Sequence, residues 1–330
     1  MTRRDFITFL SSAAVACPRV ARAQQTGRRR VVGLVLGSAP EGQIMGSDPA
    51  FLPARAFVHR LRDLGWSEGD TVIIERRSAE SQPERAPVVF AELIARGVDV
   101  MMVGASDWLM DAAQQATRSI PTVGIFTLDP AAAGHVISLA RPGGNLTGVT
   151  TTTGRELDEK RLQLLKELAP GVARVAFLGT RSAWEAYRRG ADPTVIPPVV
   201  AHANRAEDLD EAFAVAGREQ TDALLVSHGP VMFFAAPRIA TFAGVQRLPA
   251  VYPWREAVEA GGLMSYGVSV QGLFQQAAGL VDQVLKGAKA AELSVQQPTK
   301  FELVVNLKAA KALGLSIPQS ILLRADEVIE

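Results

Sequence analysis

The chain has 330 residues, of which 48% are hydrophobic and 21% are charged, as in an ordinary globular protein. Its formal net charge of +1 gives no sign of binding to nucleic acid or to a charged membrane surface. A chain of this length forms one large domain or two smaller ones.

The first 23 residues have the features of a cleavable export signal, so they are excluded from the fold prediction. Arg3 and Arg4 form a twin-arginine pattern and precede an apolar stretch over residues 6–16. This stretch is too short to span a bilayer, and Ala21-Arg22-Ala23 supplies the small residues that a signal peptidase requires. We predict cleavage after Ala23 and a periplasmic location for the mature protein.

The only cysteine, Cys17, lies inside this predicted signal. The mature chain would therefore have no disulfide, no cysteine nucleophile and no cysteine-based metal site. Lipid attachment at Cys17 is a minor alternative, because Ala14 stands where a leucine is usual and Pro18 follows the cysteine.

One pattern of strands and helices runs through the rest of the chain twice. Strands are predicted at residues 31–36, 71–75, 99–104 and 120–126, and again at 172–179, 194–200, 222–227 and 248–252. Strands that alternate with helices form βαβ units and parallel sheets. The repeat predicts two doubly wound α/β lobes that meet at a cleft.

Capping residues mark several of the helices between these strands. Asp48-Pro49 predicts a helix start, followed by apolar residues at helical spacing over residues 57–64. The capping-box patterns at residues 81–84 and 153–156 predict two further helices. The segment between residues 179 and 199 is short, so the helix after the first strand of the second copy is expected to be stunted.

Glycine-rich stretches at residues 141–148 and 261–267 mark places where the chain is expected to pass between the lobes. A helix over residues 273–285 and a strand over residues 301–306 follow. We predict a first lobe of residues 31–150 plus 262–297, and a second lobe of residues 151–261 plus 298–330. Three crossings fasten both lobes to one hinge, which permits closure by rotation about a few residues.

Residues 141–150, 259–267 and above all 297–330, which begin Gln297-Pro298-Thr299-Lys300, carry a resemblance to a known family. They resemble the periplasmic substrate-binding proteins of ABC transporters, in the branch that includes tryptophan and phenylalanine binders. The resemblance covers essentially the whole chain. It implies the type I two-lobed periplasmic binding fold and delivery of a solute to a membrane permease, with no chemistry of its own.

Ligands of open α/β sheets bind in the crevice beyond the carboxyl ends of the strands. The candidate ligand-binding residues follow predicted strand ends and are Ser38, Ser106, Asp107, Trp108, Thr127, Asp129, Thr180, Arg181, Ser182, Ser227, His228 and Trp254. Hydroxyls and backbone N–H groups suit the carboxylate of a zwitterion, and an acid suits its ammonium group. Aromatic rings stack on flat ligands, and an arginine clamps a carboxylate with two hydrogen bonds.

Several of these residues have a structural alternative. Asp129 either contacts the ligand or caps the next helix, and a loop arginine such as Arg181 or Arg255 is often simply solvated. Trp108, Trp184 and Trp254 each fit either the cleft or the core, and at least one of them is expected in the pocket. The sequence therefore favours, weakly, an aromatic or otherwise flat solute.

Together, the residues and the resemblance predict an exported, monomeric solute-binding receptor that captures an amino acid or an aromatic or organic acid and delivers it to ABC permease subunits. No cofactor, metal site or enzymatic activity is expected. A periplasmic sensor that signals to a membrane partner is the first alternative. A secreted enzyme is disfavoured, because Ser227 and His228 are adjacent in a strand and point opposite ways. A DNA regulator would need an N-terminal helix-turn-helix in place of the export signal.

Overall fold

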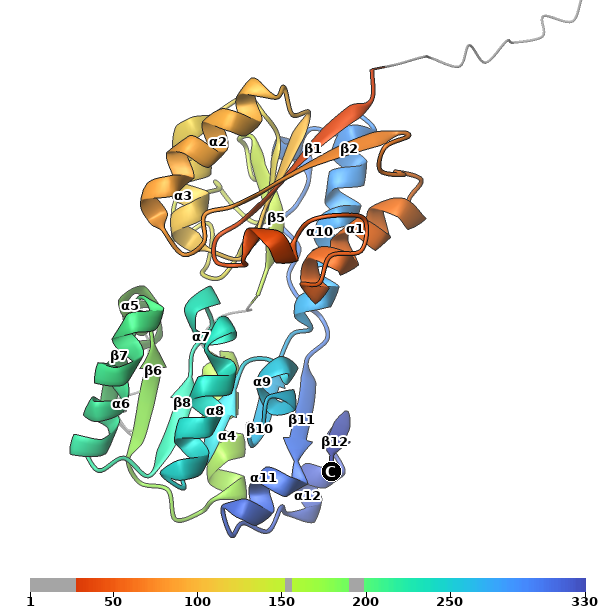
Figure 1. Ribbon diagram of the computed structural model, residues 1–330. Helices are drawn as coiled ribbons and strands as arrows, with labels where there is room; N and C mark the ends of the chain where they lie inside the picture. The colour runs from red at the N-terminus through yellow and green to blue at the C-terminus, as the bar shows by residue number, and fades with distance from the viewer. Residues whose placement is uncertain (1–27, 152–155, 190–198) are drawn as a thin grey trace, which may run out of the picture.

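The chain folds into two lobes, which Figure 1 shows one above the other and joined along one side. The computed structural model describes residues 28–151, 156–189 and 199–330. The predicted export signal with Cys17, most of the capping box that begins at Thr153 and the strand residues before Val199 lie outside these ranges. Among the described residues, no helix has the length and apolar character needed to cross a membrane.

The first lobe is built on a parallel sheet with the strand order β2-β1-β3-β4-β5. Its strands are β1 (Arg30–Leu36), β2 (Val72–Ser78), β3 (Val100–Val103), β4 (Thr122–Phe126) and β5 (Leu146–Thr150). Four of them are nearly continuous buried runs, as expected for a sheet that is covered on both faces.

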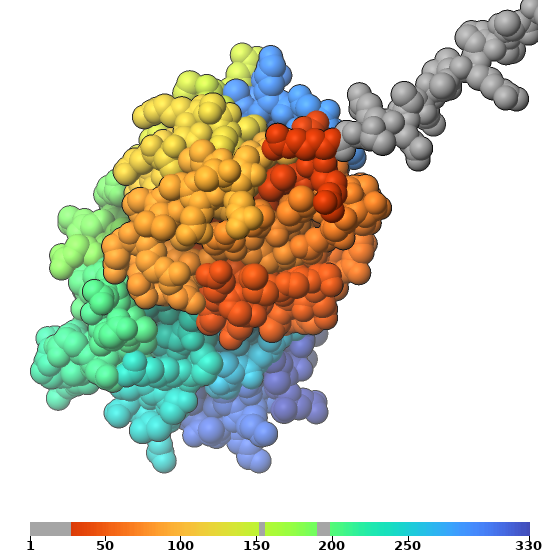
Figure 2. Space-filling model, turned by 45° about the horizontal axis from the view of Figure 1, so that its top comes forward, coloured from red at the N-terminus to blue at the C-terminus, as the bar shows by residue number. Residues whose placement is uncertain are grey.

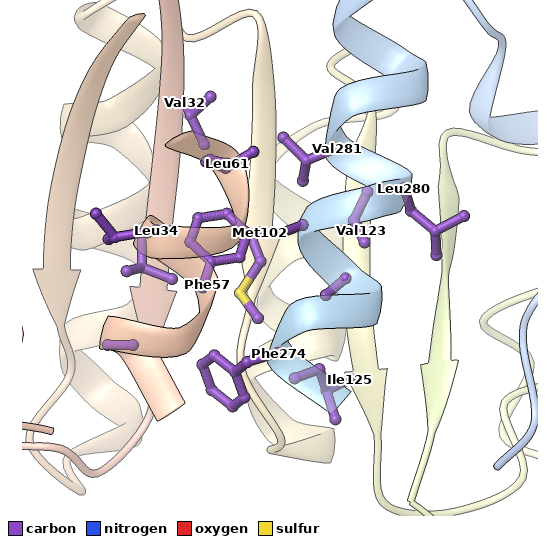
Figure 3. Close-up of a cluster of buried hydrophobic side chains, with 14 of the residues drawn as sticks. Val32, Leu34, Phe57, Leu61, Met102, Val123, Ile125, Phe274, Leu280 and Val281 are labelled. Atoms are coloured by element: carbon purple, nitrogen blue, oxygen red, sulfur yellow. The ribbon is translucent and has the colours of Figure 1, made fainter. Parts of the chain in front are cut away.

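Helices cover both faces of this sheet. The covering helices are α1 (Leu52–Asp63) and α10 (Val270–Leu285) on one face, and α2 (Ala86–Ala95) and α3 (Asp107–Ala116) on the other, with short 3-10 turns η1 (Glu41–Gln43) and η2 (Pro83–Arg85). Figure 3 shows Phe57 and Leu61 of α1 and Phe274 and Val281 of α10 packed onto Met102 of the sheet. A helix from late in the chain thus completes the core of the first lobe.

The second lobe repeats the same strand order and extends it by two strands. Its strands are β6 (Val175–Gly179), β7 (Val199–His202), β8 (Ala223–Val226), β9 (Ala250–Tyr252), β10 (Met264–Gly267), β11 (Glu302–Asn306) and β12 (Glu327–Ile329), in the order β12-β11-β10-β9-β8-β6-β7. All neighbours are parallel except β10 and β11, which are antiparallel.

The helices of the second lobe also divide between two faces. They are α4 (Glu156–Leu168), α5 (Arg181–Arg188), η3 (Ala206–Asp208), α6 (Leu209–Arg218), α7 (Pro230–Phe234), α8 (Ala236–Val245), α9 (Arg255–Glu259), α11 (Leu307–Ala312) and α12 (Gln319–Leu322), whereas the 3-10 turn η4 (Ala290–Glu292) lies beside β5 in the first lobe. Residues of α4, α5, α11 and α12 share one core, and those of α6 to α9 share the other. The helix α5 is short, as expected for the stunted segment.

The chain crosses between the lobes after β5, after β10 and before β11. The second crossing comes later than the predicted boundary at Gly262, because β10 pairs with β9 and β11 in the second sheet. The Gly261-Gly262 pair instead serves a tight turn: a Cβ on Gly262 would lie 2.6 Å from the carbonyl oxygen of Ala257. That part of the predicted domain division is wrong.

Two predicted helix starts are also corrected. Phe51 occupies the N-cap position of α1 in place of Asp48, with no side-chain cap, and Pro53 is the proline of the first turn. Ser81 does not cap a helix, because a 3-10 turn from Pro83 to Arg85 precedes α2. In both cases the helix begins beside residues buried in the lobe, Pro53 and Ala54 in α1 and Ala86 in α2, so packing outweighs a local capping signal.

Candidate ligand-binding site

A cleft lies between the lobes at the carboxyl ends of the parallel strands. Its walls come from residues that follow β1, β3 and β4 in the first lobe, and β6, β8 and β9 in the second. Figure 2 shows orange atoms of the first lobe in contact with cyan atoms of the second. The cleft therefore occupies the edge where open α/β sheets bind ligands.

The cleft has two adjoining parts. The wide compartment has a volume of about 700 Å³ and is lined by many polar side chains. The narrow compartment has a volume of about 70 Å³ and is lined mostly by apolar and aromatic side chains. Ser38, Thr127, His228, Gly229 and Pro230 line both, so they mark the junction between the two compartments.

Most of the residues predicted from the sequence gather around this cleft. The wide compartment is lined by Ser38, Ser106, Asp107, Trp108, Thr127, Asp129, Thr180, Ser182, Ser227 and His228, and the narrow one by Trp254. Arg181 lines neither compartment. It is exposed at the start of α5, and its backbone N–H donates to Asn204 Oδ1 over 2.9 Å. The expected place of Arg181 in the cleft wall is therefore wrong.

Ser106 presents a buried hydroxyl to the wide compartment from the residue that precedes α3. The residue is only 1% exposed, and its Oγ has no hydrogen-bond partner among the described residues. The nearby helix start also has free backbone N–H groups and a partial positive charge. This corner of the cleft offers hydrogen-bond donors suited to an anionic group.

Asp107 is the first residue of α3 and lines the same compartment. It accepts a hydrogen bond from Thr127 Oγ1, which follows β4. Burial raises the pKa of the Asp107 carboxyl, and the Thr127 hydroxyl opposes that shift. The first lobe thus places an acid beside the donors of Ser106.

Asp129 has a structural role, although it also lines the wide compartment. Its Oδ1 accepts hydrogen bonds from the backbone N–H groups of Ala131 (2.9 Å) and Ala132 (3.3 Å). The carboxylate caps a turn here, rather than the helix that was one of its two expected roles. One of its oxygens is therefore already engaged.

The second lobe contributes a buried arginine that the sequence analysis missed. Arg161 of α4 donates to the carbonyl oxygen of Tyr266 (2.7 Å), to Asp158 Oδ1 (2.5 Å) and to His228 Nε2 (3.1 Å). Asp158 lines the wide compartment and adds an acid from the second lobe to those of the first. Burial raises the pKa of Asp158, and Arg161 opposes the rise.

The surroundings of His228 favour the neutral form of its ring. Burial and the neighbouring Arg161 hold the pKa of His228 well below its usual range. Ser227 Oγ donates to the carbonyl oxygen of His228 over 3.2 Å, and not to its ring. The adjacent serine and histidine are therefore not arranged as a nucleophile and its base.

Thr180 and Ser182 line the second-lobe wall, but part of their hydrogen-bonding capacity is used locally. Thr180 Oγ1 caps α5 by accepting from the backbone N–H of Ala183 (3.2 Å). The two hydroxyl oxygens lie 3.0 Å apart. Arg255, a further candidate from the sequence, bonds to Glu259 and Glu327.

Aromatic rings from both lobes surround the narrow compartment. Phe51 and Phe274 belong to the first lobe, and Phe233, Phe234 and Trp254 belong to the second. The ring of Trp254 packs edge-on against Phe233, with the centroids 5.3 Å apart. Of these rings, only Trp254 was predicted, because the phenylalanines lie inside apolar helical stretches that look like ordinary core.

The three tryptophans have different surroundings. Trp108 lines the wide compartment and Trp254 the narrow one. Trp184 packs against Phe177 and Tyr187, with ring centroids 5.4 and 5.8 Å away. Two of the three tryptophans therefore line the cleft, while Trp184 belongs to the core of the second lobe.

The described parts of the chain hold no group of three or more His, Cys, Asp or Glu side chains placed to bind a metal ion. The cleft is therefore defined by hydrogen-bonding groups, acids and aromatic rings. This combination binds a small organic molecule that has both polar and apolar parts.

A family model described as "ABC transporter substrate binding protein" matches residues 44–329. A curated tyrosine-binding protein from Clostridioides difficile (strain R20291) is 23% identical over 271 residues, which cover 79% of this chain and 76% of that protein. A solved conserved domain protein from Vibrio cholerae O1 biovar El Tor has a TM-score of 0.81 and 24% identity, and the match covers 91% of this chain and all of that one.

A solved ABC domain in complex with L-Trp, from Streptococcus pneumonia, has a TM-score of 0.80 and 24% identity, over 92% of this chain and 100% of that chain. At these identities, the solved structures show the fold. The predicted fold class, two parallel-sheet lobes of the type I periplasmic binding kind, is confirmed.

Proposed function

This chain belongs to the ABC transporter substrate-binding protein family, and on that premise we propose that it captures an amino acid with an apolar, flat side chain between its lobes. The observation that carries the proposal is the two-part cleft, in which a polar wide compartment adjoins an aromatic narrow one. The names of two relatives, a tyrosine-binding protein and a domain in complex with L-Trp, support this ligand class.

The polar end of the ligand occupies the wide compartment. Its carboxylate accepts hydrogen bonds from Ser106 and from donors of the second lobe, and its ammonium group faces Asp107 and Asp158. Groups from both lobes then hold one ligand. A ligand that contacts both lobes binds the closed form more tightly, so it shifts the population toward closure.

The apolar side chain of the ligand extends from the junction toward the narrow compartment. Ring edges and faces from Phe51, Phe233 and Trp254 are available there. Aromatic pairs favour edge-on and offset arrangements of this kind. The narrow compartment widens when the lobes separate, because its wall is shared between them.

The mature protein is a monomer in the periplasm after cleavage at Ala23, and the closed, loaded form delivers its solute to ABC permease subunits. It performs no chemistry on the ligand and requires no cofactor. The organisation of two hinged lobes around a cleft supports transport, because release only requires the lobes to reopen. Mass spectrometry of the exported protein tests the cleavage site: an N-terminus other than Gln24 contradicts that part of the proposal.

A thermal-shift screen followed by calorimetry tests the ligand class. We expect L-Trp, L-Tyr or L-Phe to raise the melting temperature of the purified mature protein, because a ligand that binds only the folded state stabilises it. Matched ligands are the same side chains without the amino group or without the carboxylate, which should bind more weakly. Recovery of the amino acid chemically unchanged is expected, and its conversion to a product would contradict a binding role.

A further inference from the structure

Arg161 occupies a position that an ordinary surface arginine does not. It is 0% exposed and lies on the inner face of α4, where its stem packs in the core of the second lobe. Its Nε, Nη1 and Nη2 atoms donate to three different groups: the carbonyl of Tyr266, the Asp158 carboxylate and the His228 ring. Because all three groups come from different elements, the guanidinium has one orientation.

This geometry determines the tautomer of His228. A guanidinium only donates hydrogen bonds, so His228 Nε2, which lies 3.1 Å from Arg161 Nη2, accepts. A ring nitrogen that accepts carries no proton, and the single proton of the neutral ring is then on Nδ1. Trp254 lies edge-on to the ring at a centroid distance of 5.7 Å, which restricts its rotation.

The Nδ1 atom has no hydrogen bond to the described residues, while His228 lines both the wide and the narrow compartment. We propose that Arg161 is a positioning residue, which fixes His228 as a neutral Nδ1–H donor for the ligand at the junction of the two compartments. This inference rests on the proposed function. The Nδ1–H group donates to an oxygen of the bound amino acid. We assign this oxygen to the ligand's carboxylate, which lies at the junction of the two compartments.

The charges around His228 favour the neutral ring. Asp158 is engaged by Arg161, and the other ionisable groups that line the wide compartment are Glu84, Asp107, Asp111, Asp129 and Arg205. A cationic ring would lie beside the guanidinium of Arg161 and would have to give up its hydrogen bond. The donor therefore stays neutral from about pH 5 to pH 8, a range in which an ordinary histidine changes charge.

The direct test is long-range ¹H–¹⁵N NMR of the ligand-free, full mature chain with ¹⁵N-labelled histidine. We expect the His228 signals to show the neutral Nδ1–H tautomer at every pH between about 5 and 8, with assignment from their loss in His228→Asn. A neutral Nε2–H pattern, or protonation with a midpoint in that range, would overturn the inference. This measurement needs no ligand, so its result is independent of whether the proposed function holds.

Two substitutions of His228 test its role toward a ligand, with L-tryptophan as the probe in calorimetry. Asn places an amide nitrogen near the position of Nδ1, whereas Gln places its amide near the position of Nε2. We expect His228→Asn to stay within about threefold of the wild type and His228→Gln to lose about tenfold or more in affinity. Equal affinities for the wild type and His228→Gln would contradict the inference. His59→Asn, on the exposed side of α1, is the matched control and should bind as the wild type does.

Substitution of Arg161 separates positioning from simple stability. In Arg161→Met the His228 ring loses its donor, so its protonation is expected to return toward the usual range and L-tryptophan affinity should vary with pH. The affinity of the wild type for L-tryptophan is expected to vary less with pH.

If Arg161→Met does not fold, Arg161→Lys is the second variant. It keeps the positive charge but loses the guanidinium that donates to three groups at once, and a mixture of His228 tautomers is expected by NMR. An unchanged tautomer in a folded variant would overturn the role of Arg161. Failure of L-tryptophan and every other amino acid to bind the wild type would count against the proposed function instead.

Discussion

The ring of Phe51 in the first lobe lies 5.5 Å from the ring of Phe234 in the second, measured between centroids. Phe51 also contacts Phe233 edge-on at 6.1 Å and Phe274 of its own lobe at 6.3 Å. An apolar contact therefore joins the lobes directly, beside the narrow compartment and apart from the three crossings. The contact stabilises this arrangement of the lobes, since separation would expose these rings to water.

Phe234→Ala should weaken this contact without disturbing either core, because Phe234 is 38% exposed. An aromatic pair contributes about 1 kcal/mol, so we expect the lobes of the ligand-free variant to separate more often. Small-angle scattering should report a larger radius of gyration than for the wild type. Val245→Ala, a change at another exposed apolar residue of the second lobe, is the control. An unchanged radius for Phe234→Ala would show that the contact between Phe51 and Phe234 does not hold the lobes together.

Gly148 in β5 is required by the close approach of β4. A Cβ at this position would lie 1.9 Å from the carbonyl oxygen of Gly124, and the three nearest atoms all belong to the Gly124 backbone, which cannot turn aside as a flexible side chain can. We expect Gly148→Ala to lower the free energy of unfolding by about 3 kcal/mol in chemical denaturation. Gly144→Ala, in the same glycine-rich stretch, meets no atom within 4 Å and should change it little. Similar losses for the two variants would argue against steric packing as the reason for Gly148.

The positions of strand ends made much of the candidate site predictable. The repeated strand–helix pattern indicates which loops share an edge, and Ser106, Asp107 and Thr127 lie at that edge as expected. Arg181 shows the limit of this reasoning. A loop at the correct edge still has two sides, and local geometry at the start of α5 directs the backbone of Arg181 to Asn204.

Two parts of the site required the tertiary structure. Phe233 and Phe234 lie in a short apolar helix, and nothing in their spacing separates a cleft wall from a core. Arg161 did leave a signal, because it shares a helical stripe with Leu157, Leu164 and Leu168, all of which are buried. A charged residue on such a stripe needs a buried polar partner, so the stripe indicates that groups such as His228 and Asp158 lie beside Arg161.

Asp107→Asn tests the acid of the first lobe through pH. Because burial raises the pKa of Asp107 above its ordinary value of 3.8, the folded state binds the proton more tightly than the unfolded chain. The stability that this proton supplies is present below the unfolded value and is lost as pH rises through the folded value. We therefore expect the melting temperature of Asp107→Asn relative to the wild type to increase between about pH 4 and pH 8.

The same substitution should weaken binding of a ligand that carries an ammonium group, by about tenfold, because a charge-assisted hydrogen bond is lost. Affinity for the matched ligand without an amino group should change less. Calorimetry with both ligands at neutral pH separates these outcomes. An equal loss for both ligands would show that Asp107 is not the ammonium partner. A stability difference that shrinks with rising pH would contradict the raised pKa of the Asp107 carboxyl.

Ser106→Ala should make the ligand-free protein more stable and should lower its affinity for the ligand. The Ser106 hydroxyl is buried and has no partner among the residues that the structure describes, and such a group costs about 1–3 kcal/mol relative to an apolar side chain of the same shape. Its removal relieves that cost, while a bound carboxylate loses one hydrogen-bond donor, so the affinity for the ligand should fall about tenfold.

Ser78→Ala is the matched contrast, because the equally buried Ser78 hydroxyl bonds to Ala39 and Glu80 and its loss should lower stability. Thermal unfolding with and without L-tryptophan distinguishes the two, since Ser106 lines the wide compartment, where a ligand can satisfy its hydroxyl, and Ser78 does not. If Ser106→Ala destabilised the protein and left binding unchanged, the hydroxyl would have a structural partner and no role in the cleft.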